Sequence, residues 1–408
     1  MAISRRQKIT DFLGLKKSMV ALLAMVVLVG LGEKMAERFL PIYIMALGGG
    51  AITIGLLNGM TNLLSALYSF PGGYLSDRLG YKKALLIFNL IALFGYGIVI
   101  LFPYWQAVII GAIFFLSWSA ISLPATMSLV SRVLPQDKRT MGVTVHSLVR
   151  RLPMALGPII GGVLIGIYGE ATGVRLAFTG AFFLGAASLV LQQVMITDDE
   201  KRGKAEKRPS RLWRHMSPQL KNLLLADILI RFAEQIPYAF VVVWCMKYNA
   251  ITATQFGFLT AIEMITAVVV YIPVAYMADR SGKKPFVVIT FINFTIFPLI
   301  LLFSHSLGMM VIAFIIRGLK EFGEPTRKAL IMDLAPEDKK AGMFGLYYLI
   351  RDVIVSFGAF GGAYLWQISP EVNFLTAFAC GLLGTTYFWI CGKDLTGGKT
   401  RQKQVLLS

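Results

Sequence analysis

The chain has 408 residues, of which 56% are hydrophobic and only 15% are charged, and its formal net charge is +18. A soluble domain keeps roughly 25% of its residues charged, so this composition excludes an ordinary soluble protein of the same length. The three cysteines are too few for a disulfide framework, and the three histidines lack metal-ligand spacing. We therefore expect an integral membrane protein that holds neither a metal nor another cofactor.

Long apolar runs follow one another along the chain, with short polar breaks between them. A spanning helix needs about 20 mostly apolar residues. Runs of that kind lie near 18–47, 52–76, 84–103, 106–133, 140–168, 175–196, 218–246, 253–278, 285–304, 308–333, 341–367 and 371–392. They do not alternate in polarity as the strands of a membrane barrel would, and only helices or closed barrels satisfy the backbone in lipid. The pattern predicts an all-α integral membrane protein with twelve transmembrane helices.

The twelve runs fall into two groups of six with a charged stretch between them. We expect this stretch to be a cytoplasmic linker that joins two pseudo-symmetric six-helix bundles. The predicted N-terminal segment, first bundle, linker, second bundle and C-terminal tail are 1–17, 18–196, 197–217, 218–392 and 393–408.

Basic residues indicate which side of the membrane each connection faces, because cytoplasmic connections carry an excess of Lys and Arg. Such residues gather in both terminal segments and in every second connection, whereas the opposite connections hold only Arg175 and Lys247. Both termini are therefore predicted to be cytoplasmic, and the short loops favour a cell (inner) membrane. Since topology explains the net charge, we expect no nucleic-acid partner.

The two groups of six share a sequence repeat. Matching residues occur in the same order at a near-constant offset, among them Ala36-Glu37 with Ala233-Glu234, Asp77-Arg78 with Asp279-Arg280, Arg150 with Arg351, and Gly157 and Gly161 with Gly358 and Gly362. Several independent matches in one order indicate an internal duplication. Parallel repeats of six helices place a binding site between the halves near the membrane midplane.

A short basic turn follows the second run of each group. It reads Gly73-Tyr-Leu-Ser-Asp77-Arg78-Leu-Gly80-Tyr81-Lys82-Lys83 in the first group and Asp279-Arg280-Ser-Gly282-Lys283-Lys284 in the second. Both segments resemble the cytoplasmic signature of the major facilitator superfamily, with Ala275 in place of the leading glycine of the second copy. The resemblance implies a conformational gate formed by Gly73, Asp77, Arg78, Gly80, Lys82, Asp279, Arg280 and Gly282. Physically, Gly80 allows a tight turn and Asp77 can accept hydrogen bonds from a helix N-terminus. The alternative is that these turns only fix topology.

The run 140–168 carries the segment Pro153-Met-Ala-Leu-Gly157-Pro158-Ile-Ile-Gly161-Gly162. It resembles the antiporter signature of the twelve-span drug:proton branch of the superfamily, although Pro153 and Thr144 stand where that pattern has glycines. The resemblance adds Gly157, Pro158, Gly161 and Gly162 to the predicted gate. Small residues also allow close helix packing, so ordinary packing is the alternative.

Ionisable residues within spans are costly, and they are functional hypotheses by default. The resemblance to the superfamily implies that the runs 18–47, 218–246 and 308–333 line a central cavity, and these runs hold most of the charges. A buried carboxyl has a raised pKa and can exchange protons near neutral pH; the candidate proton-coupling residues are Glu33, Glu37, Asp227, Glu234, Glu263, Glu321 and Glu324. The candidate substrate-binding residues are Lys34, Arg38, Asn58, Asn62, Arg231, Gln235, Tyr238, Arg317, Lys320 and Arg351. The alternative is internal ion pairing, through Glu33–Arg38, Asp227–Arg231 and Arg317–Glu321.

These features favour a monomeric secondary active transporter that works by alternating access. We expect proton-coupled antiport that exports an amphiphilic or charged small molecule, with protons, the substrate and membrane lipids as its partners. Uptake or exchange of an organic anion or phosphorylated metabolite, and export of a lipid-like substrate, remain alternatives. A receptor or scaffold would need a large extra-membrane domain, and an enzyme would need a nucleophile–base pair, a metal cluster or a phosphate loop, none of which the sequence shows.

Overall fold

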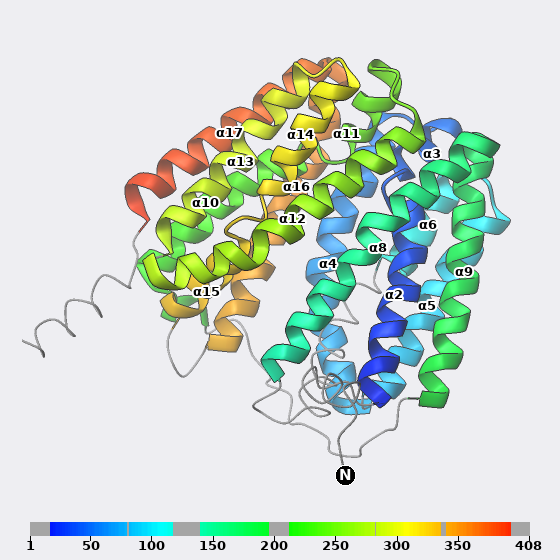
Figure 1. The fold of residues 1–408 in the computed structure, drawn as a ribbon, viewed down its shortest axis with the longest axis horizontal. Helices are drawn as coiled ribbons and strands as arrows, with labels where there is room; N and C mark the ends of the chain where they lie inside the picture. The colour runs from blue at the N-terminus through cyan, green and yellow to red at the C-terminus, as the bar shows by residue number, and fades with distance from the viewer. Residues whose placement is uncertain are drawn as a thin grey trace, which may run out of the picture. The chain divides into compact units, whose positions relative to one another are not determined.

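The computed structural model describes residues 17–79, 81–116, 139–195, 212–281, 283–335 and 340–392. Within these ranges the regular structure is helical, without strands (Figure 1). Nine helices of this described part are long and apolar enough to cross a membrane. The predicted all-α class is therefore confirmed. The second half of the predicted span 106–133 lies outside the described residues.

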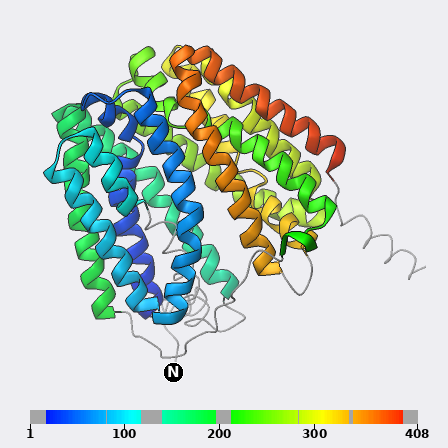
Figure 2. The same ribbon diagram turned by 180° about the vertical axis from the view of Figure 1, so that it is seen from behind.

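One compact unit comprises Met1–Gly50, Leu63–Glu206 and Ala250–Ala261. Its helices are α2 (Lys17–Glu37), α3 (Leu40–Ala46), the later part of α4 (Ala51–Leu79), α5 (Tyr81–Leu101), α6 (Trp105–Phe115), α8 (Arg139–Tyr168), α9 (Glu170–Met195) and the first part of α12 (Ala253–Ser281). In this unit α2 packs along both α8 and α9, and α5 packs against α6 and α9 (Figure 1, and from behind in Figure 2). We call it unit 1.

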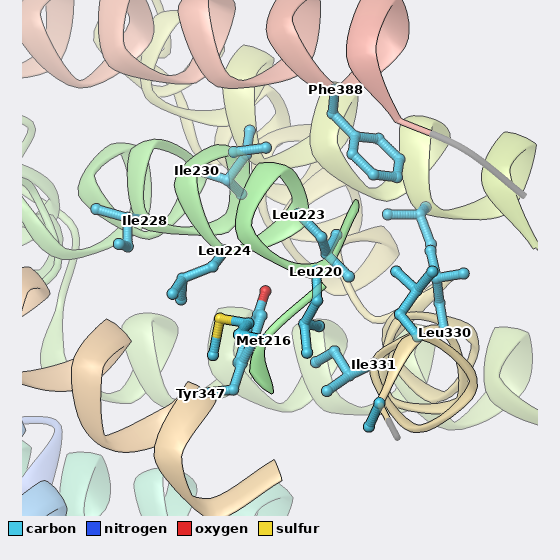
Figure 3. Close-up of a cluster of buried hydrophobic side chains, with 14 of the residues drawn as sticks. Met216, Leu220, Leu223, Leu224, Ile228, Ile230, Leu330, Ile331, Tyr347 and Phe388 are labelled. Carbon is cyan, nitrogen blue, oxygen red and sulfur yellow. The ribbon is translucent and has the colours of Figure 1, made fainter. Parts of the chain in front are cut away.

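The second unit comprises Ala51–Asn62, Lys207–Asn249 and Ile262–Ser408. Besides the first part of α4 and the rest of α12, it contains the 3₁₀ helix Leu212–His215, α10 (Pro218–Gln235), α11 (Phe240–Val243), the π-helix Trp244–Tyr248, α13 (Lys284–Leu302), α14 (Leu307–Leu319), α15 (Glu324–Leu334), α16 (Lys340–Ile368) and α17 (Pro370–Cys391). A buried hydrophobic cluster joins α10, α13, α15, α16 and α17 through side chains such as Leu220, Ile331, Tyr347 and Phe388 (Figure 3). We call it unit 2.

Glycines repeated in the sequence make equivalent contacts in the two units. In unit 1, a Cβ added to Gly161 of α8 would lie 2.0 Å from the carbonyl oxygen of Met35 in α2. In unit 2, a Cβ added to Gly362 of α16 would lie 2.3 Å from the carbonyl oxygen of Ile236, just after α10. Only glycine allows two helix backbones to come this close. The repeat therefore extends from the sequence to the helix contacts.

Three of the predicted spans are interrupted within the membrane-spanning stretch. The run 18–47 divides into α2 and α3, the run 218–246 into α10, α11 and the π-helix, and the run 308–333 into α14 and α15. Pro41, Pro237 and Pro325 lie at or just after these breaks. Proline lacks the N–H that a continuing helix needs, but it is tolerated in a first turn. Each of these three runs is therefore made of more than one helical segment.

Each unit includes a helix end from the other half of the sequence. The first part of α4 joins unit 2, where Gly55 and Gly59 contact Ala363 and Phe360 of α16. The first part of α12 joins unit 1, where a Cβ added to Gly257 would lie 2.4 Å from the carbonyl oxygen of Pro158 in α8. The compact units thus differ from the two sequence halves by these two exchanged segments.

Candidate functional site

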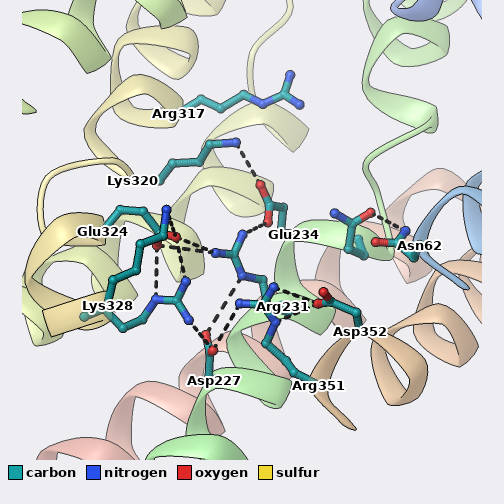
Figure 4. A network of polar contacts seen from close by, with 12 residues as sticks. Asn62, Asp227, Arg231, Glu234, Arg317, Lys320, Glu324, Lys328, Arg351 and Asp352 are labelled. Atoms are coloured by element: carbon teal, nitrogen blue, oxygen red, sulfur yellow. Dashed lines mark hydrogen bonds and ion pairs between the residues drawn. The ribbon is translucent and has the colours of Figure 1, made fainter. Parts of the chain in front are cut away.

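A cluster of buried charges lies inside unit 2 around Asp227 of α10 (Figure 4). The Asp227 carboxylate accepts hydrogen bonds from the Arg327 guanidinium and, at 3.0 Å, from the Tyr347 hydroxyl. Arg351 of α16 donates to the same oxygen at 3.4 Å. The side chains of Asp227 and Arg327 are each only 1% exposed. Removing one partner of such a buried pair is strongly destabilising, so this part of the network holds α10, α15 and α16 together.

Glu324 connects that structural part to the rest of the network. Its carboxylate accepts hydrogen bonds from Arg327 at 2.6 and 3.1 Å and lies 3.3 Å from Arg231. Arg231 in turn donates to Glu234 at 2.6 Å. Two acids, one from α15 and one from α10, therefore share one guanidinium, whose fork of donors suits such double contacts.

Glu234 and Lys320 form an ion pair that is more accessible than Asp227–Arg327. The Lys320 ammonium lies 2.8 Å from a Glu234 oxygen, and both side chains are 11% exposed. Lys320 also lies 3.4 Å from Glu263 of α12, which lies 3.4 Å from Arg317 of α14. Acidic and basic side chains therefore alternate along a continuous series of contacts.

This series borders a small pocket of unit 2. The pocket is lined by Glu234, Val241, Asn293, Phe294, Phe297, Arg317 and Lys320. The space open to the centre of a water molecule is about 10 Å³, which is about the room that one water needs. The Arg317 guanidinium lies 5.2 Å from the centre of the Phe297 ring, and Lys320 lies 5.8 Å from that of Phe294. Aromatic faces stabilise cations at such distances, so the pocket combines charges of both signs with apolar walls.

The break between α14 and α15 places charges where the helix dipoles favour them. Arg317 and Lys320 lie at the C-terminal end of α14, and Glu324 lies in the first turn of α15. A helix C-terminus favours cations and an N-terminus favours anions. Gly323 makes the turn possible, because a Cβ there would lie 2.4 Å from the carbonyl oxygen of Phe286.

The predicted amide side chains also meet in unit 2. Asn62 of α4 donates to the Gln235 side chain at 3.1 Å, and Asn58 donates to the Gln235 carbonyl at 2.9 Å. These bonds satisfy polar groups at the end of α10, where the helix stops. Three of the predicted substrate-binding residues thereby meet, and one of them, Gln235, follows Glu234 in the sequence.

A smaller charged group lies in unit 1 on α2. The Lys34 ammonium contacts the carboxylate of Glu37 and lies 3.2 Å from that of Glu33. The glycine motif of α8 packs directly against this group, since a Cβ added to Gly157 would lie 2.6 Å from the Cβ of Lys34. Gly162 faces α12, with its added Cβ 2.4 Å from the carbonyl oxygen of Ala253. The motif thus makes close helix contacts on two sides.

Two residues of the expected internal ion pairs also contact partners that spacing did not predict. The expected Asp227–Arg231 pair is present at 3.9 Å. Glu33, however, lies beside Lys34, and Arg317 lies beside Glu263 on another helix. Spacing along one helix identifies partners only within that helix, so it could not indicate the Arg317–Glu263 contact.

The predicted cytoplasmic gate lies largely outside the described side chains. Gly80 and Gly282 fall outside the described residues. For five other residues of the gate the structure describes only the backbone of α4 and α12: Gly73, Asp77, Arg78, Asp279 and Arg280. Lys82 is described, and its ammonium donates to the carbonyl of Gln193 at 3.0 Å. This contact joins the start of α5 to the end of α9.

Two residues at the centre of the network are absent from the predicted site residues. Arg327 contacts both Asp227 and Glu324. Its position three residues after Glu324 was the feature of the sequence that could have indicated this ion pair. The Tyr347 hydroxyl donates a hydrogen bond to Asp227. A tyrosine within an apolar run could have indicated such a contact, because a buried hydroxyl needs a hydrogen-bond partner.

Buried charges beside a pocket, together with helices long and apolar enough to cross a membrane, are features of a membrane transport protein. The sequence model of the Major Facilitator Superfamily matches residues 22–233 and 223–404. The chain therefore belongs to the Major Facilitator Superfamily. Its all-helical fold with candidate membrane spans agrees with the twelve-helix, two-bundle fold of that family.

Relatives and solved structures agree with this family. An uncharacterized MFS-type transporter of Methanocaldococcus jannaschii is 21% identical over 85% of this chain and 87% of its own length. The staphylopine export protein of Staphylococcus aureus is 25% identical over 85% of this chain and 88% of its own. The crystal structure of a nucleoside transporter has a TM-score of 0.79 at 11% identity, covering 92% of this chain and all of that one. The last likeness supports the fold alone.

Proposed function

We propose that this protein is a secondary active transporter that exports an amphiphilic or charged small molecule in exchange for protons. The observation that carries the proposal is the Glu234–Lys320 ion pair, 2.8 Å long and partly accessible beside a pocket with aromatic walls. The name of one relative, the staphylopine export protein, supports the direction of transport. The resemblance of the α8 glycine motif to an antiporter signature supports the coupling.

Proton coupling follows from what protonation does to an ion pair. A proton that binds Glu234 removes its charge, so the attraction to Lys320 and Arg231 is lost and the pair can separate. Glu37 has the corresponding place in the sequence repeat and contacts Lys34, three residues before it, as Glu234 contacts Arg231. In the proposed cycle, a substrate and a proton compete for these carboxylates.

The two six-helix bundles, 18–196 and 218–392, would move as the halves of an alternating-access transporter. The protein would act as a monomer in the cell membrane, with both termini in the cytoplasm.

Everted membrane vesicles test the coupling directly. The vesicles are energised to acidify their interior, which an acridine dye reports by quenching, and a panel of organic cations, zwitterions and anions is added. We expect at least one class of solute to release protons from vesicles with the wild-type protein. Glu37→Gln and Glu234→Gln should each abolish this release because neither amide can carry a proton.

The matched control for these variants is Glu170→Gln at the start of α9, since it removes a carboxyl in the same unit as Glu37 but away from the α2 cluster. It should behave like the wild type. Unchanged proton release in both Glu37→Gln and Glu234→Gln would show that these carboxylates do not carry the coupled proton.

The pocket also supports a second candidate function, the uptake or exchange of an organic anion. Arg317 lies in the pocket lining, is 3% exposed and keeps its charge when buried. Direction separates the two functions. Export predicts accumulation of the solute inside energised everted vesicles, whereas uptake predicts accumulation in right-side-out vesicles.

A further inference from the structure

Every charge that lines the pocket of unit 2 already has an opposite charge close by. Glu234 and Lys320 face each other at 2.8 Å, and Arg317 and Lys320 each lie 3.4 Å from Glu263. Glu234 also has a second cation, Arg231, at 2.6 Å. A ligand that binds here by its charge therefore has to displace a partner from an existing ion pair.

The sign of the ligand decides what this displacement costs. A cation that binds Glu234 takes the place of Lys320, and an anion that binds Lys320 takes the place of Glu234. In either case one charge of the pair keeps only its second partner, Glu263 for Lys320 or Arg231 for Glu234, which is unfavourable in a poorly solvated site. A ligand with both charges replaces both halves of the pair at once: its ammonium binds Glu234 and its carboxylate binds Lys320.

We propose that the substrate is a small zwitterion, with an ammonium and a carboxylate on one compact head group and an apolar remainder. This inference rests on the proposed function, in that the pocket is taken as the substrate site. As described, the pocket has room for about one water, so the zwitterion enters as the ion pair opens and the pocket widens. Phe294 and Phe297 line the same pocket and would contact the apolar part. Arg317 would supply a second donor for the carboxylate, since it lies in the lining.

Position and local backbone single out Glu234–Lys320 as the pair that opens, because both of its members line the pocket. Both of its side chains are 11% exposed, whereas Asp227 and Arg327 are 1% exposed. Lys320 belongs to the turn after α14 and not to the helix itself. It can therefore move with that turn while the hydrogen bonds within α14 and α15 stay intact.

Matched sets of probes on one carbon skeleton test the proposal with the purified full-length protein. The first set is L-phenylalanine, phenethylamine and 3-phenylpropionate, and the second is L-leucine, 3-methylbutylamine and 4-methylpentanoate. Binding is measured by calorimetry and by the shift in thermal unfolding. We expect the zwitterion of at least one set to bind about tenfold more tightly than both of its singly charged analogues. A singly charged analogue that binds as tightly as its zwitterion in both sets would overturn the proposal, as would the absence of binding by every member.

Charge-neutralised variants locate the preference in this pair. Glu234→Gln should shift the preference towards the carboxylate probe, and Lys320→Gln should shift it towards the amine. The exposed residues Glu371 and Lys221 provide matched controls, and Glu371→Gln and Lys221→Gln should keep the preference of the wild type. If a single variant does not yield folded protein, the double variant Glu234→Gln/Lys320→Gln removes both halves of the pair and should bind the three probes of a set about equally. Retention of the wild-type preference in these pocket variants would show that the zwitterion site lies elsewhere.

These measurements separate the inference from the proposed function. Binding to the purified protein needs no proton gradient, so loss of the zwitterion preference contradicts the substrate class and leaves proton exchange untouched. Conversely, zwitterion binding without any solute-driven proton release would contradict the proposed exchange and keep the substrate class.

Discussion

At the scale of single residues, Arg327 carries a large share of the buried electrostatics of unit 2. Its guanidinium contacts both Asp227 and Glu324, and its side chain is 1% exposed. Arg327→Met should therefore lower the free energy of unfolding by about 3–5 kcal/mol, because two carboxylates lose a partner in a buried setting. Thermal and denaturant unfolding of the purified protein in one detergent would measure this loss.

The neighbouring residue provides the control for this substitution. Lys328 lies 3.7 Å from Glu324, but its side chain is 47% exposed. Lys328→Met should change the stability by less than about 1 kcal/mol, because water screens an exposed pair. Equal losses in the two variants would contradict the structural role given to the buried pair.

At the scale of helices, the close contact of α16 with the end of α10 depends on the absence of a side chain at Gly362. An added methyl would lie 2.3 Å from the carbonyl oxygen of Ile236, so Gly362→Ala forces the helices apart. The expected cost is about 1–3 kcal/mol, as for other overpacked contacts. The shift in thermal unfolding of the purified protein would measure it.

The preceding position, Gly361, has no atom within 4 Å of an added Cβ. Gly361→Ala should therefore be neutral or stabilise α16 by up to about 1 kcal/mol, since alanine restricts the unfolded chain more than glycine. A loss of stability at Gly361 as large as that at Gly362 would show that backbone propensity, and not the helix contact, decides the outcome.

Hydrophobic patterning predicted where the helices lie but not where three of them stop. Four prolines lie inside continuous helices: Pro153, Pro158, Pro273 and Pro298. Three others lie at or after breaks: Pro41, Pro237 and Pro325. A proline has the same local effect at each of these places, so the sequence around it does not distinguish the two outcomes. What differs is the surroundings: the breaks in α10–α11 and α14–α15 lie beside ion pairs such as Glu234–Lys320, whose partners come from other helices.

Contacts between distant helices also limit how much of the site could be predicted. A charge inside an apolar run is visible in the sequence, so Asp227, Glu234 and Arg317 were among the predicted site residues. Which charge pairs with which depends on contacts between helices that are far apart in the chain. The contact of Arg317 with Glu263, at 3.4 Å, is of this kind. The list of charged residues could therefore be predicted, and the order of their contacts could not.

At the scale of the whole molecule, the two copies of the cytoplasmic signature differ at the leading glycine. The first copy has Gly73 before Asp77, and the second has Ala275 before Asp279. A glycine allows a closer approach of the neighbouring backbone, so we expect the first copy to form the tighter contact in one state of the transport cycle. Asp77→Asn should therefore reduce the rate of transport more than Asp279→Asn, as measured by solute flux in reconstituted vesicles. Equal rates for the two variants, at equal amounts of folded protein, would remove this asymmetry.

The exchange of helix ends between the units has a consequence for synthesis of the protein. Unit 1 includes Ala250–Ala261, which the ribosome adds only after the linker and α10 have been made. Until then the glycine surface of α8 at Gly162 lacks the segment that covers it in the finished unit. The first half of the chain therefore cannot complete its own packing while it is being inserted. Its maturation must wait for translation of the second half, and a nascent chain arrested before residue 250 would present this small-residue surface to the insertion machinery or to lipid.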